Sequence, residues 1–174
     1  MKPDLARART VRLMIFDVDG VLTDGRIYYA DSGEEMKAFS TLDGHGIRML
    51  MASGVGIALL TGRRSDVVGH RARNLGIDRV LQGVEDKRTA FIELAGSLGL
   101  DPGQCGYMGD DVVDLPVLTR CGFAVATREA PEIVRQHAHF VATHPAGAGA
   151  VREVCETVMR EQGTLDAALA PYLA

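Results

Sequence analysis

The stretch that decides the fold reads Val11-Arg12-Leu13-Met14-Ile15-Phe16-Asp17-Val18-Asp19-Gly20-Val21-Leu22-Thr23. Its apolar part predicts a strand over residues 11–18, because parallel strands covered on both faces are nearly continuously apolar. Asp17 and Asp19 stand two residues apart where this strand ends, so their side chains project to the same side. Gly20 then allows the backbone to turn away sharply. The first strand is therefore expected to deliver two carboxylates to one site.

Apolar runs alternate with segments of helical periodicity along the rest of the chain. Further strands are predicted over residues 55–60, 79–81, 105–108, 122–125 and 139–141. Helices are predicted over residues 43–52, 64–75, 87–98, 112–120, 130–135 and 148–160. This alternation indicates an α/β fold of the Rossmann-like kind, in which a mainly parallel sheet carries helices on both faces.

One segment breaks the alternation directly after the first strand. The β-prone stretches 26–30 and 34–39 flank the turn signal Asp31-Ser32-Gly33, which predicts a hairpin flap over about residues 25–40. The flap is too small to be a cap domain. We therefore expect a single domain over residues 1–174, with a C-terminal helix and tail over about residues 147–174.

Composition excludes several classes of protein. Of the 174 residues, 47% are hydrophobic and 24% are charged, which argues against a disordered or fibrous chain. The formal net charge of −4 gives no excess of positive charge that would attract nucleic acid or an anionic membrane. The apolar run over residues 13–16 is too short to span a bilayer. Cys105, Cys121 and Cys155 form no C-x-x-C pair, so we expect reduced, buried thiols and a cytoplasmic protein.

A second strand end also carries carboxylates. Asp110 and Asp111 follow the predicted strand over residues 105–108, and Asp114 lies one helical turn further on. A helix start alone would explain Asp111, because acidic residues favour the first turn of a helix. It does not explain why two strands both end in carboxylates, which repel one another unless a cation lies between them. Mg²⁺, which prefers oxygen ligands, would fit such a site.

Two further strand and helix ends offer groups that bind phosphate. Thr61 provides a hydroxyl and Gly62 an accessible backbone N–H after the strand over residues 55–60, although a simple helix cap would look the same. Lys87 lies at the start of a predicted helix, where a cation opposes the helix dipole unless it has an anionic partner. A solvated lysine is the alternative for Lys87.

The four elements in this order resemble the motif set of the haloacid dehalogenase superfamily of phosphotransferases. The resemblance covers nearly the whole chain and implies a Mg²⁺-dependent reaction through an aspartyl-phosphate. It implies that Asp17 is the nucleophile and Asp19 the general acid and base, that Thr61, Gly62 and Lys87 bind the phosphate, that Asp17, Asp19 and Asp110 bind the metal, and that Asp111 and Asp114 support these groups.

The chain resembles one family of this superfamily more closely, the 3-deoxy-D-manno-octulosonate 8-phosphate phosphatases of lipopolysaccharide precursor synthesis. The stretches that carry this likeness are residues 16–25, 43–48, 60–63, 109–117 and 147–153. The family implies a phosphorylated sugar acid as substrate. It also implies a homotetramer without large cap domains, in which hairpins and C-terminal segments of neighbouring subunits cap each site. The stretch over residues 145–149 departs slightly from the Gly-rich run that the family often carries there.

Alternatives remain open at the level of substrate and of function. Arg63 resembles the octulosonate type, whereas related enzymes for a nine-carbon sugar acid 9-phosphate tend to carry an acidic residue there. Arg63, Arg64 and Arg152 are candidates for the substrate carboxylate, because an arginine binds it with two parallel hydrogen bonds. His45 is a candidate for substrate contact. A non-catalytic assembly module on the same fold is the alternative from another class.

Overall fold

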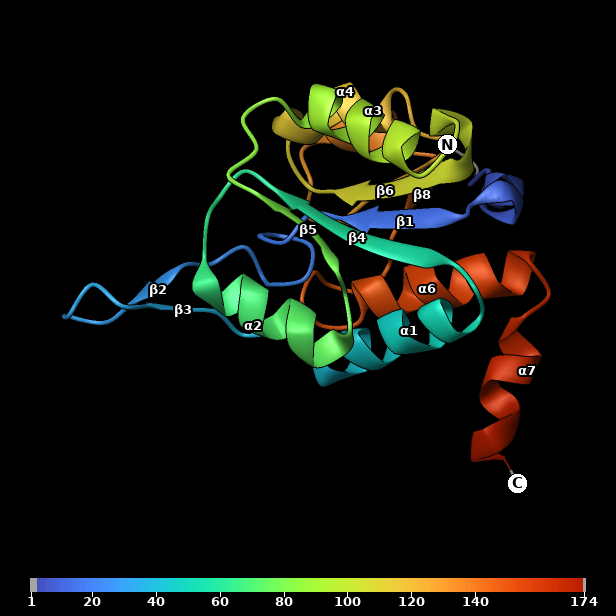
Figure 1. Ribbon diagram of the computed structural model, residues 1–174, viewed down its shortest axis with the longest axis horizontal. Coiled ribbons are helices and arrows are strands. Elements are labelled where there is room, and N and C mark those ends of the chain that lie inside the picture. The colour runs from blue at the N-terminus through green and yellow to red at the C-terminus, as the bar shows by residue number, and fades with distance from the viewer. Residues whose placement is uncertain (1–2, 174) are drawn as a thin grey trace.

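Six parallel strands form one sheet in the computed structural model, which describes residues 3–173 (Figure 1). The order across the sheet is β5-β4-β1-β6-β7-β8, so the first strand lies near the centre. The strands are β1 (Leu13–Phe16), β4 (Gly56–Thr61), β5 (Arg79–Gln82), β6 (Cys105–Gly109), β7 (Phe123–Ala126) and β8 (Phe140–Val141). Each of the six predicted sheet strands is confirmed, with ends that move by one to a few residues.

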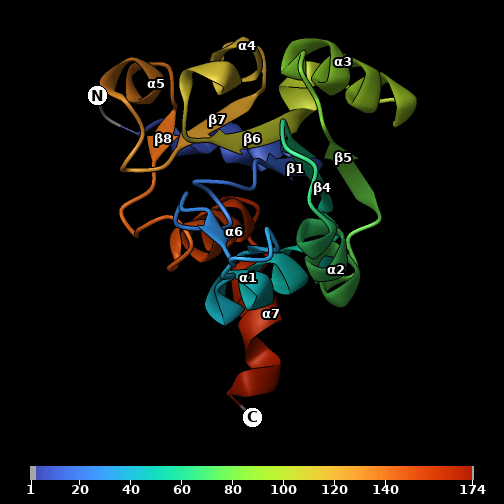
Figure 2. The same cartoon turned by 90° about the vertical axis from the view of Figure 1, so that its left-hand side faces the viewer.

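Helices cover both faces of the sheet, as the strand pattern predicted (Figure 2). One face carries α1 (Thr41–Ala52), α2 (Asp66–Leu75) and α6 (Ala150–Glu161), and the other carries α3 (Lys87–Ser97), α4 (Leu115–Leu118) and α5 (Glu132–Gln136). Successive side chains of β1 point to opposite faces of the sheet, so this strand contributes to the core under both helix layers. Met14 and Phe16 join the core beneath α1 and α6, whereas Leu13 and Ile15 join the core beneath α3 and α4. All four side chains are buried, which accounts for the continuously apolar run.

Two segments differ from the predicted helices. The helix expected over residues 112–120 is divided into the 3₁₀ turn η3 (Val112–Asp114) and the short helix α4. The carboxylate of Asp114 accepts the backbone N–H groups of Asp110 and Asp111, which holds the strand exit in a tight turn. The C-terminal tail is also more regular than expected. It forms α7 (Leu165–Leu169) and η4 (Ala170–Tyr172). Elsewhere in the chain, η1 (Leu5–Thr10) and η2 (Pro102–Gln104) are short 3₁₀ turns.

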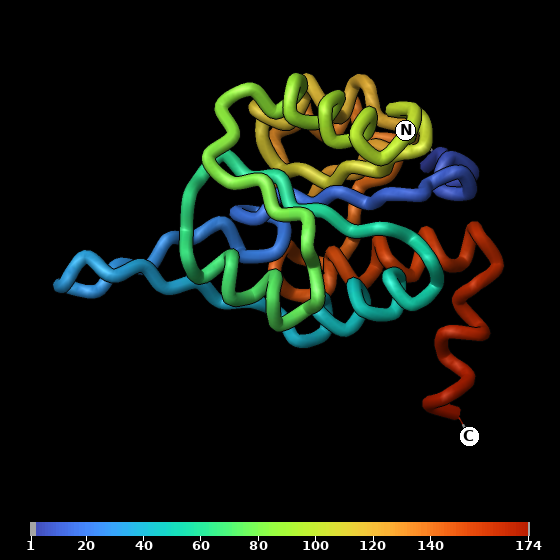
Figure 3. Tube along the Cα trace, viewed as in Figure 1, coloured from blue at the N-terminus to red at the C-terminus, as the bar shows by residue number. Residues whose placement is uncertain are grey.

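The predicted hairpin is present and projects from the sheet edge where the parallel strands end (Figures 1 and 3). It consists of β2 (Tyr28–Tyr29) and β3 (Glu35–Met36), paired antiparallel with Tyr28 opposite Met36 and Tyr29 opposite Glu35. The ladder is shorter than the predicted β-prone stretches. Tyr28, Tyr29 and Met36 are exposed, so this short ladder is not covered by the body of the same chain.

The segment before α6 fixes the loop that follows β1. Gly147 donates its backbone N–H to Val21 at 3.1 Å, and a Cβ added to Gly147 would lie 2.7 Å from the carbonyl carbon of Thr23. Its φ of +64° also favours glycine. The buried carboxylate of Asp43 in α1 accepts backbone N–H groups at the start of α6, which satisfies donors that the helix itself leaves unpaired. The C-terminal third of the chain therefore supports the loop at the end of β1.

Two expectations from composition can be compared with this structure. Cys105, Cys121 and Cys155 are free and buried, as expected. Within residues 3–173, no helix combines the length and the apolar character that crossing a bilayer requires.

Candidate active site

A cavity of about 310 Å³ opens at the carboxyl ends of β1, β4 and β6. This is the edge of an open α/β sheet at which ligands are bound. The residues that line the cavity are Asp17, Asp19, Gly25, Thr61, Gly62, Arg63, Val84, Glu85, Lys87, Asp110, Asp111 and Val113. The structure therefore brings most of the predicted site residues together, although they come from four separate stretches of sequence.

Asp17 lies at the floor of this cavity, directly after β1. One carboxylate oxygen accepts the backbone N–H of Val18 at 2.7 Å, and the other accepts the ammonium of Lys87 at 2.6 Å. Burial raises the pKa of Asp17 to about 6, although the positive charge of Lys87 lowers it in part. Asp17 is thus a buried carboxylate with one oxygen bound to a cation and the other to a backbone N–H.

Lys87 is buried because three polar side chains surround its ammonium. In addition to Asp17, Asp114 accepts from it at 2.7 Å, and the hydroxyl oxygen of Tyr107 lies 3.4 Å away. Burial by itself lowers the pKa of Lys87, but the two carboxylates outweigh this effect and the net pKa is raised. Lys87 is therefore a charged lysine at the start of α3, and the anionic partners that its position requires are Asp17 and Asp114.

Asp110 completes a group of three carboxylates. One oxygen each from Asp17, Asp110 and Asp114 lie within 4.8 Å of one another. Burial, together with the charges of Asp17 and Asp114, raises the pKa of Asp110 to about 7. A Cβ on Gly20 would lie 2.0 Å from an Asp110 oxygen, so only glycine lets the backbone pass this close. Clustered oxygens that repel one another in this way fit a divalent cation.

This group of three carboxylates contains Asp114 in place of Asp19, which belongs to the predicted metal set. Asp114 is fully buried and already accepts from Lys87, from the Tyr107 hydroxyl at 2.6 Å and from two backbone N–H groups. Its oxygens are occupied, so it orients Lys87 instead of offering a free ligand. The Asp19 carboxylate lies outside the group. It faces the hairpin, where Lys37 donates to one of its oxygens and Arg63 Nε lies 3.6 Å from the other.

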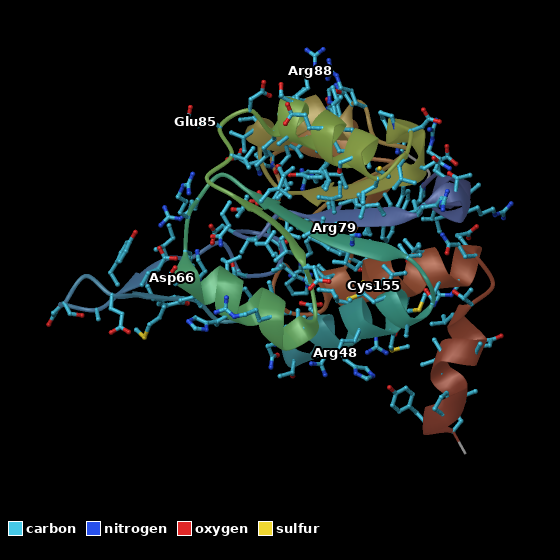
Figure 4. The ribbon with its side chains drawn as sticks, viewed as in Figure 1. Arg48, Asp66, Arg79, Glu85, Arg88 and Cys155 are labelled. Atoms are coloured by element: carbon cyan, nitrogen blue, oxygen red, sulfur yellow. The ribbon has the colours of Figure 1, made fainter. Side chains whose placement is uncertain are left out.

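Thr61 and Gly62, which are predicted to bind phosphate, line the same cavity. Thr61 ends β4 with a buried side chain, and Gly62 is exposed beside it. The helix that follows begins at Asp66 and not at residue 64, so a short turn separates Gly62 from the helix start. Glu85, exposed on the loop between β5 and α3 (labelled in Figure 4), also lines this cavity. Thr61, Gly62 and Glu85 thus add a hydroxyl, a backbone N–H and a further acidic side chain to the carboxylates that line the cavity.

Three of the candidates for substrate contact do not line this cavity. Arg152 lies on α6, where its Nε donates to Glu156 at 2.5 Å and its side chain packs against Gly46 of α1. The side chain of Arg64 packs against Gly83. His45 stacks edge-on against Tyr172, with ring centroids 5.3 Å apart, in a separate cavity between α1 and α7. Within one chain, Arg63 is the arginine that lines the site.

Sequence reasoning missed Lys37, Glu35 and Tyr107. Tyr107 lies inside a strand that reads as core, and its position two residues before Gly109 is the only sequence signal for a role at the strand end. Lys37 and Glu35 lie on the hairpin, and no motif connects them to the carboxylates of β1. Lys37 contacts Asp19, and Glu35 contacts Lys37 and Arg63, because the returning strand of the hairpin passes beside the end of β1.

The chain is similar to known proteins over most of its length. A family model of haloacid dehalogenase-like hydrolases matches residues 79–154. The 3-deoxy-D-manno-octulosonate 8-phosphate phosphatase KdsC of Yersinia pestis is 44% identical over 164 residues, which cover 94% of this chain and 88% of that protein.

Solved structures give the same picture. A probable YrbI family phosphatase from Pseudomonas syringae pv. phaseolicola superposes with a TM-score of 0.96 and 46% identity, over 98% of this chain and 97% of that one. The 3-deoxy-D-manno-octulosonate 8-phosphate phosphatase of Moraxella catarrhalis, crystallised with a magnesium ion, a phosphate ion and a KDO molecule, superposes with a TM-score of 0.95 and 40% identity, over 97% of both chains.

Proposed function

The chain belongs to the family of 3-deoxy-D-manno-octulosonate 8-phosphate phosphatases, and we propose that it hydrolyses 3-deoxy-D-manno-octulosonate 8-phosphate to the free sugar acid and inorganic phosphate. This reaction would serve lipopolysaccharide precursor synthesis. The observation that carries the proposal is the buried contact of Asp17 with Lys87 at 2.6 Å, beside Asp110, at the carboxyl ends of the central strands. A carboxylate held in this way can act as a nucleophile toward a phosphoryl group.

The first step transfers the phosphoryl group to Asp17. A carboxylate oxygen of Asp17 forms a bond to phosphorus while the bond from phosphorus to the sugar oxygen breaks. Asp19, protonated at this stage, gives its proton to the departing sugar oxygen, which leaves as a hydroxyl. Asp19 suits this task because its carboxylate lines the cavity next to Asp17 yet lies outside the cluster that surrounds Lys87.

The second step releases phosphate and restores the enzyme. Asp19, now a carboxylate, takes a proton from water while the water oxygen bonds to phosphorus. The bond between phosphorus and the Asp17 oxygen breaks in the same step, so Asp17 returns as a carboxylate and Asp19 returns protonated. Lys87, Thr61 and the backbone of Gly62 hold the phosphoryl oxygens during both steps, which is the positioning and electrostatic work that phosphoryl transfer needs.

The residues present also fit a bound Mg²⁺. Asp17 and Asp110 supply carboxylate oxygens from the ends of two strands. Burial, together with repulsion from neighbouring carboxylates, raises their pKa values, and a cation would relieve that repulsion. When bound, Mg²⁺ neutralises negative charge on the phosphoryl group. Asp114 and Asp111 support this set, Asp114 by orienting Lys87 and Asp111 by capping the turn after β6 through its bond to the Val112 N–H.

We further propose that the enzyme works in the cytoplasm as a homotetramer, in which neighbouring subunits cap each site. The support is the hairpin, which projects from the site edge and exposes Tyr28, Tyr29 and Met36. Apolar surface of this kind is typical of contacts between copies. Arg152 does not line the cavity of its own chain, so it would reach a substrate only in such an assembly. Sedimentation velocity tests the assembly directly, and a fully active monomer would contradict it.

A phosphate-release assay tests the function. The substrates are 3-deoxy-D-manno-octulosonate 8-phosphate, a nine-carbon sugar acid 9-phosphate and a neutral sugar phosphate, each with Mg²⁺ and with a chelator. We expect the highest kcat/KM with the eight-carbon substrate, no activity with chelator, and none for Asp17→Asn. The matched control is Asp78→Asn, an exposed aspartate at the amino end of β5, and it should keep full activity. Preference for the nine-carbon substrate would change the substrate assignment, and no phosphate release from any substrate would favour an assembly module.

A further inference from the structure

The hairpin places a lysine with a buried side chain beside Asp19. The side chain of Lys37, one residue after β3, has 0% of its surface exposed, although its backbone lies on a projecting hairpin. Its ammonium donates to the Oδ1 atom of Asp19 and lies 3.1 Å from the Oε1 atom of Glu35. A lysine is rarely buried without anionic partners, because removing its charge from water is costly. The burial of Lys37 therefore depends on these two carboxylates.

Lys37 is part of a closed ring of alternating charges. Glu35 accepts from Arg63 at 2.8 Å, and Arg63 Nε in turn lies 3.6 Å from the Oδ2 atom of Asp19. Burial alone would raise the pKa of Glu35, but Arg63 and Lys37 outweigh it and hold that pKa at about 2. Glu35 is therefore charged at neutral pH and joins the two cations on either side of Asp19.

The two oxygens of Asp19 are held differently in this ring. Lys37 binds Oδ1 closely, whereas the separation of 3.6 Å between Oδ2 and Arg63 Nε exceeds hydrogen-bond distance. Asp19 also lines the cavity, as does Arg63. One oxygen is thus anchored by a hydrogen bond from the hairpin, whereas the other accepts no hydrogen bond within this ring.

We propose that Lys37 is a positioning residue, which holds Asp19 Oδ1 so that Oδ2 faces the leaving-group oxygen and later the attacking water. The inference rests on the proposed function, because it concerns the acid and base of that reaction. Glu35 keeps the Lys37 ammonium in place, and it ties the hairpin to Arg63 and so to the end of β4. The hairpin would then act on the chemistry through Asp19, without touching the transferred group.

The obvious alternative is that Lys37 only anchors the hairpin. The two roles differ in what they predict for a leaving group that needs no proton. If Lys37 positions Asp19, its loss slows the first step for an alkyl phosphate, which needs an acid, but spares it for p-nitrophenyl phosphate. The second step needs Asp19 as a base for both substrates. If Lys37 only anchors the hairpin, its loss should lower the rates of both steps with both substrates.

The experiment compares Lys37→Met, Lys37→Arg and the control Arg26→Met in the full chain. Arg26 is an exposed cation on the same hairpin, 3.9 Å from Asp24 and outside the ring. With the sugar acid phosphate, we expect Lys37→Met to lower kcat by about 10- to 100-fold with little change in KM, since general acid and base catalysis contributes about 10²- to 10⁴-fold. Lys37→Arg should recover part of the loss. With p-nitrophenyl phosphate, Lys37→Met should show a rapid burst of product before a slow steady state.

A double-mutant cycle with Asp19→Asn provides the decisive readout. If Lys37 acts through Asp19, adding Lys37→Met to Asp19→Asn should change kcat less than twofold, because groups that act as a unit are not additive. An equal loss in both backgrounds, or a Lys37→Met enzyme without the burst, would overturn the proposal. Circular dichroism and thermal unfolding show whether Lys37→Met has folded, and Lys37→Arg keeps the test valid if it has not. A wild-type chain inactive on every phosphate ester would instead refute the proposed function.

Discussion

Replacing Asp114 with asparagine should destabilise the protein strongly while changing its shape very little. Asp114 is fully buried, and each of its oxygens accepts two donors. An asparagine offers one oxygen and one NH₂ group, so two of the four donors would face another donor whichever way the amide is turned. If the NH₂ group replaces Oδ1, the Lys87 ammonium and the Tyr107 hydroxyl lose their acceptor.

The size of the effect follows from these contacts. Each buried donor left without a partner costs about 1 to 3 kcal/mol, and a buried ion pair that loses one partner costs about 3 to 5 kcal/mol. Removing the negative charge also relieves repulsion with Asp17 and Asp110, which offsets part of the loss. We therefore expect the free energy of unfolding to fall by about 3 kcal/mol, equivalent to a decrease in Tm of about 6 to 12 °C for a chain of this size.

The assay is urea and thermal unfolding in the presence of a chelator, so that bound cations do not add stability to one variant only. Asp78→Asn is the matched control, since it makes the same chemical change at an exposed carboxylate just before β5, and it should stay within about 0.5 kcal/mol of the wild type. A decrease below about 1 kcal/mol for Asp114→Asn would refute the reasoning, because it would mean that the four donors find other partners.

Three further predictions concern the metal, the nucleophile and the C-terminal support. In chelator, stability should rise as pH falls from about 8 to 5, because the raised pKa values of Asp110 and Asp17 mean that the folded state binds more protons than the unfolded state. When Mg²⁺ is added, Tm measured across that pH range should depend much less on pH. Asp17→Asn should abolish phosphate release, because an amide cannot act as the nucleophile that forms the aspartyl-phosphate, and release above the background rate would contradict this. Gly147→Ala should lower Tm by several degrees, because a Cβ would lie 2.7 Å from the Thr23 carbonyl carbon, and an unchanged Tm would show that the loop gives way.

The sheet and most of the site could be predicted because both depend on local signals. A buried parallel strand is continuously apolar, and the residues at its carboxyl end are the ones that reach a ligand. Asp17, Thr61 and Asp110 stand directly at such ends, so the sequence alone indicates that their side chains lie close together.

The remaining features depend on contacts between distant segments. Asp19 is held by Lys37, which follows β3 at the base of the hairpin, and no local pattern in the sequence indicates that these two residues meet. Arg152 looked suited to a carboxylate by its residue type, but its place on α6 is set by packing against Gly46 of α1. The 3₁₀ turn after β6 depends on Asp114 accepting backbone N–H groups, which helical periodicity does not indicate.

The charge ring around Asp19 also bears on how this chain can change in length. Glu35 and Lys37 share one face of the returning strand because they stand two residues apart, and Met36 between them points to solvent. An insertion or deletion between them would turn one of the two away from Asp19. The tip over residues 31–33 is exposed and takes no part in the ring. Length variation among natural versions of this hairpin should therefore gather at its tip, while the spacing within the returning strand stays constant.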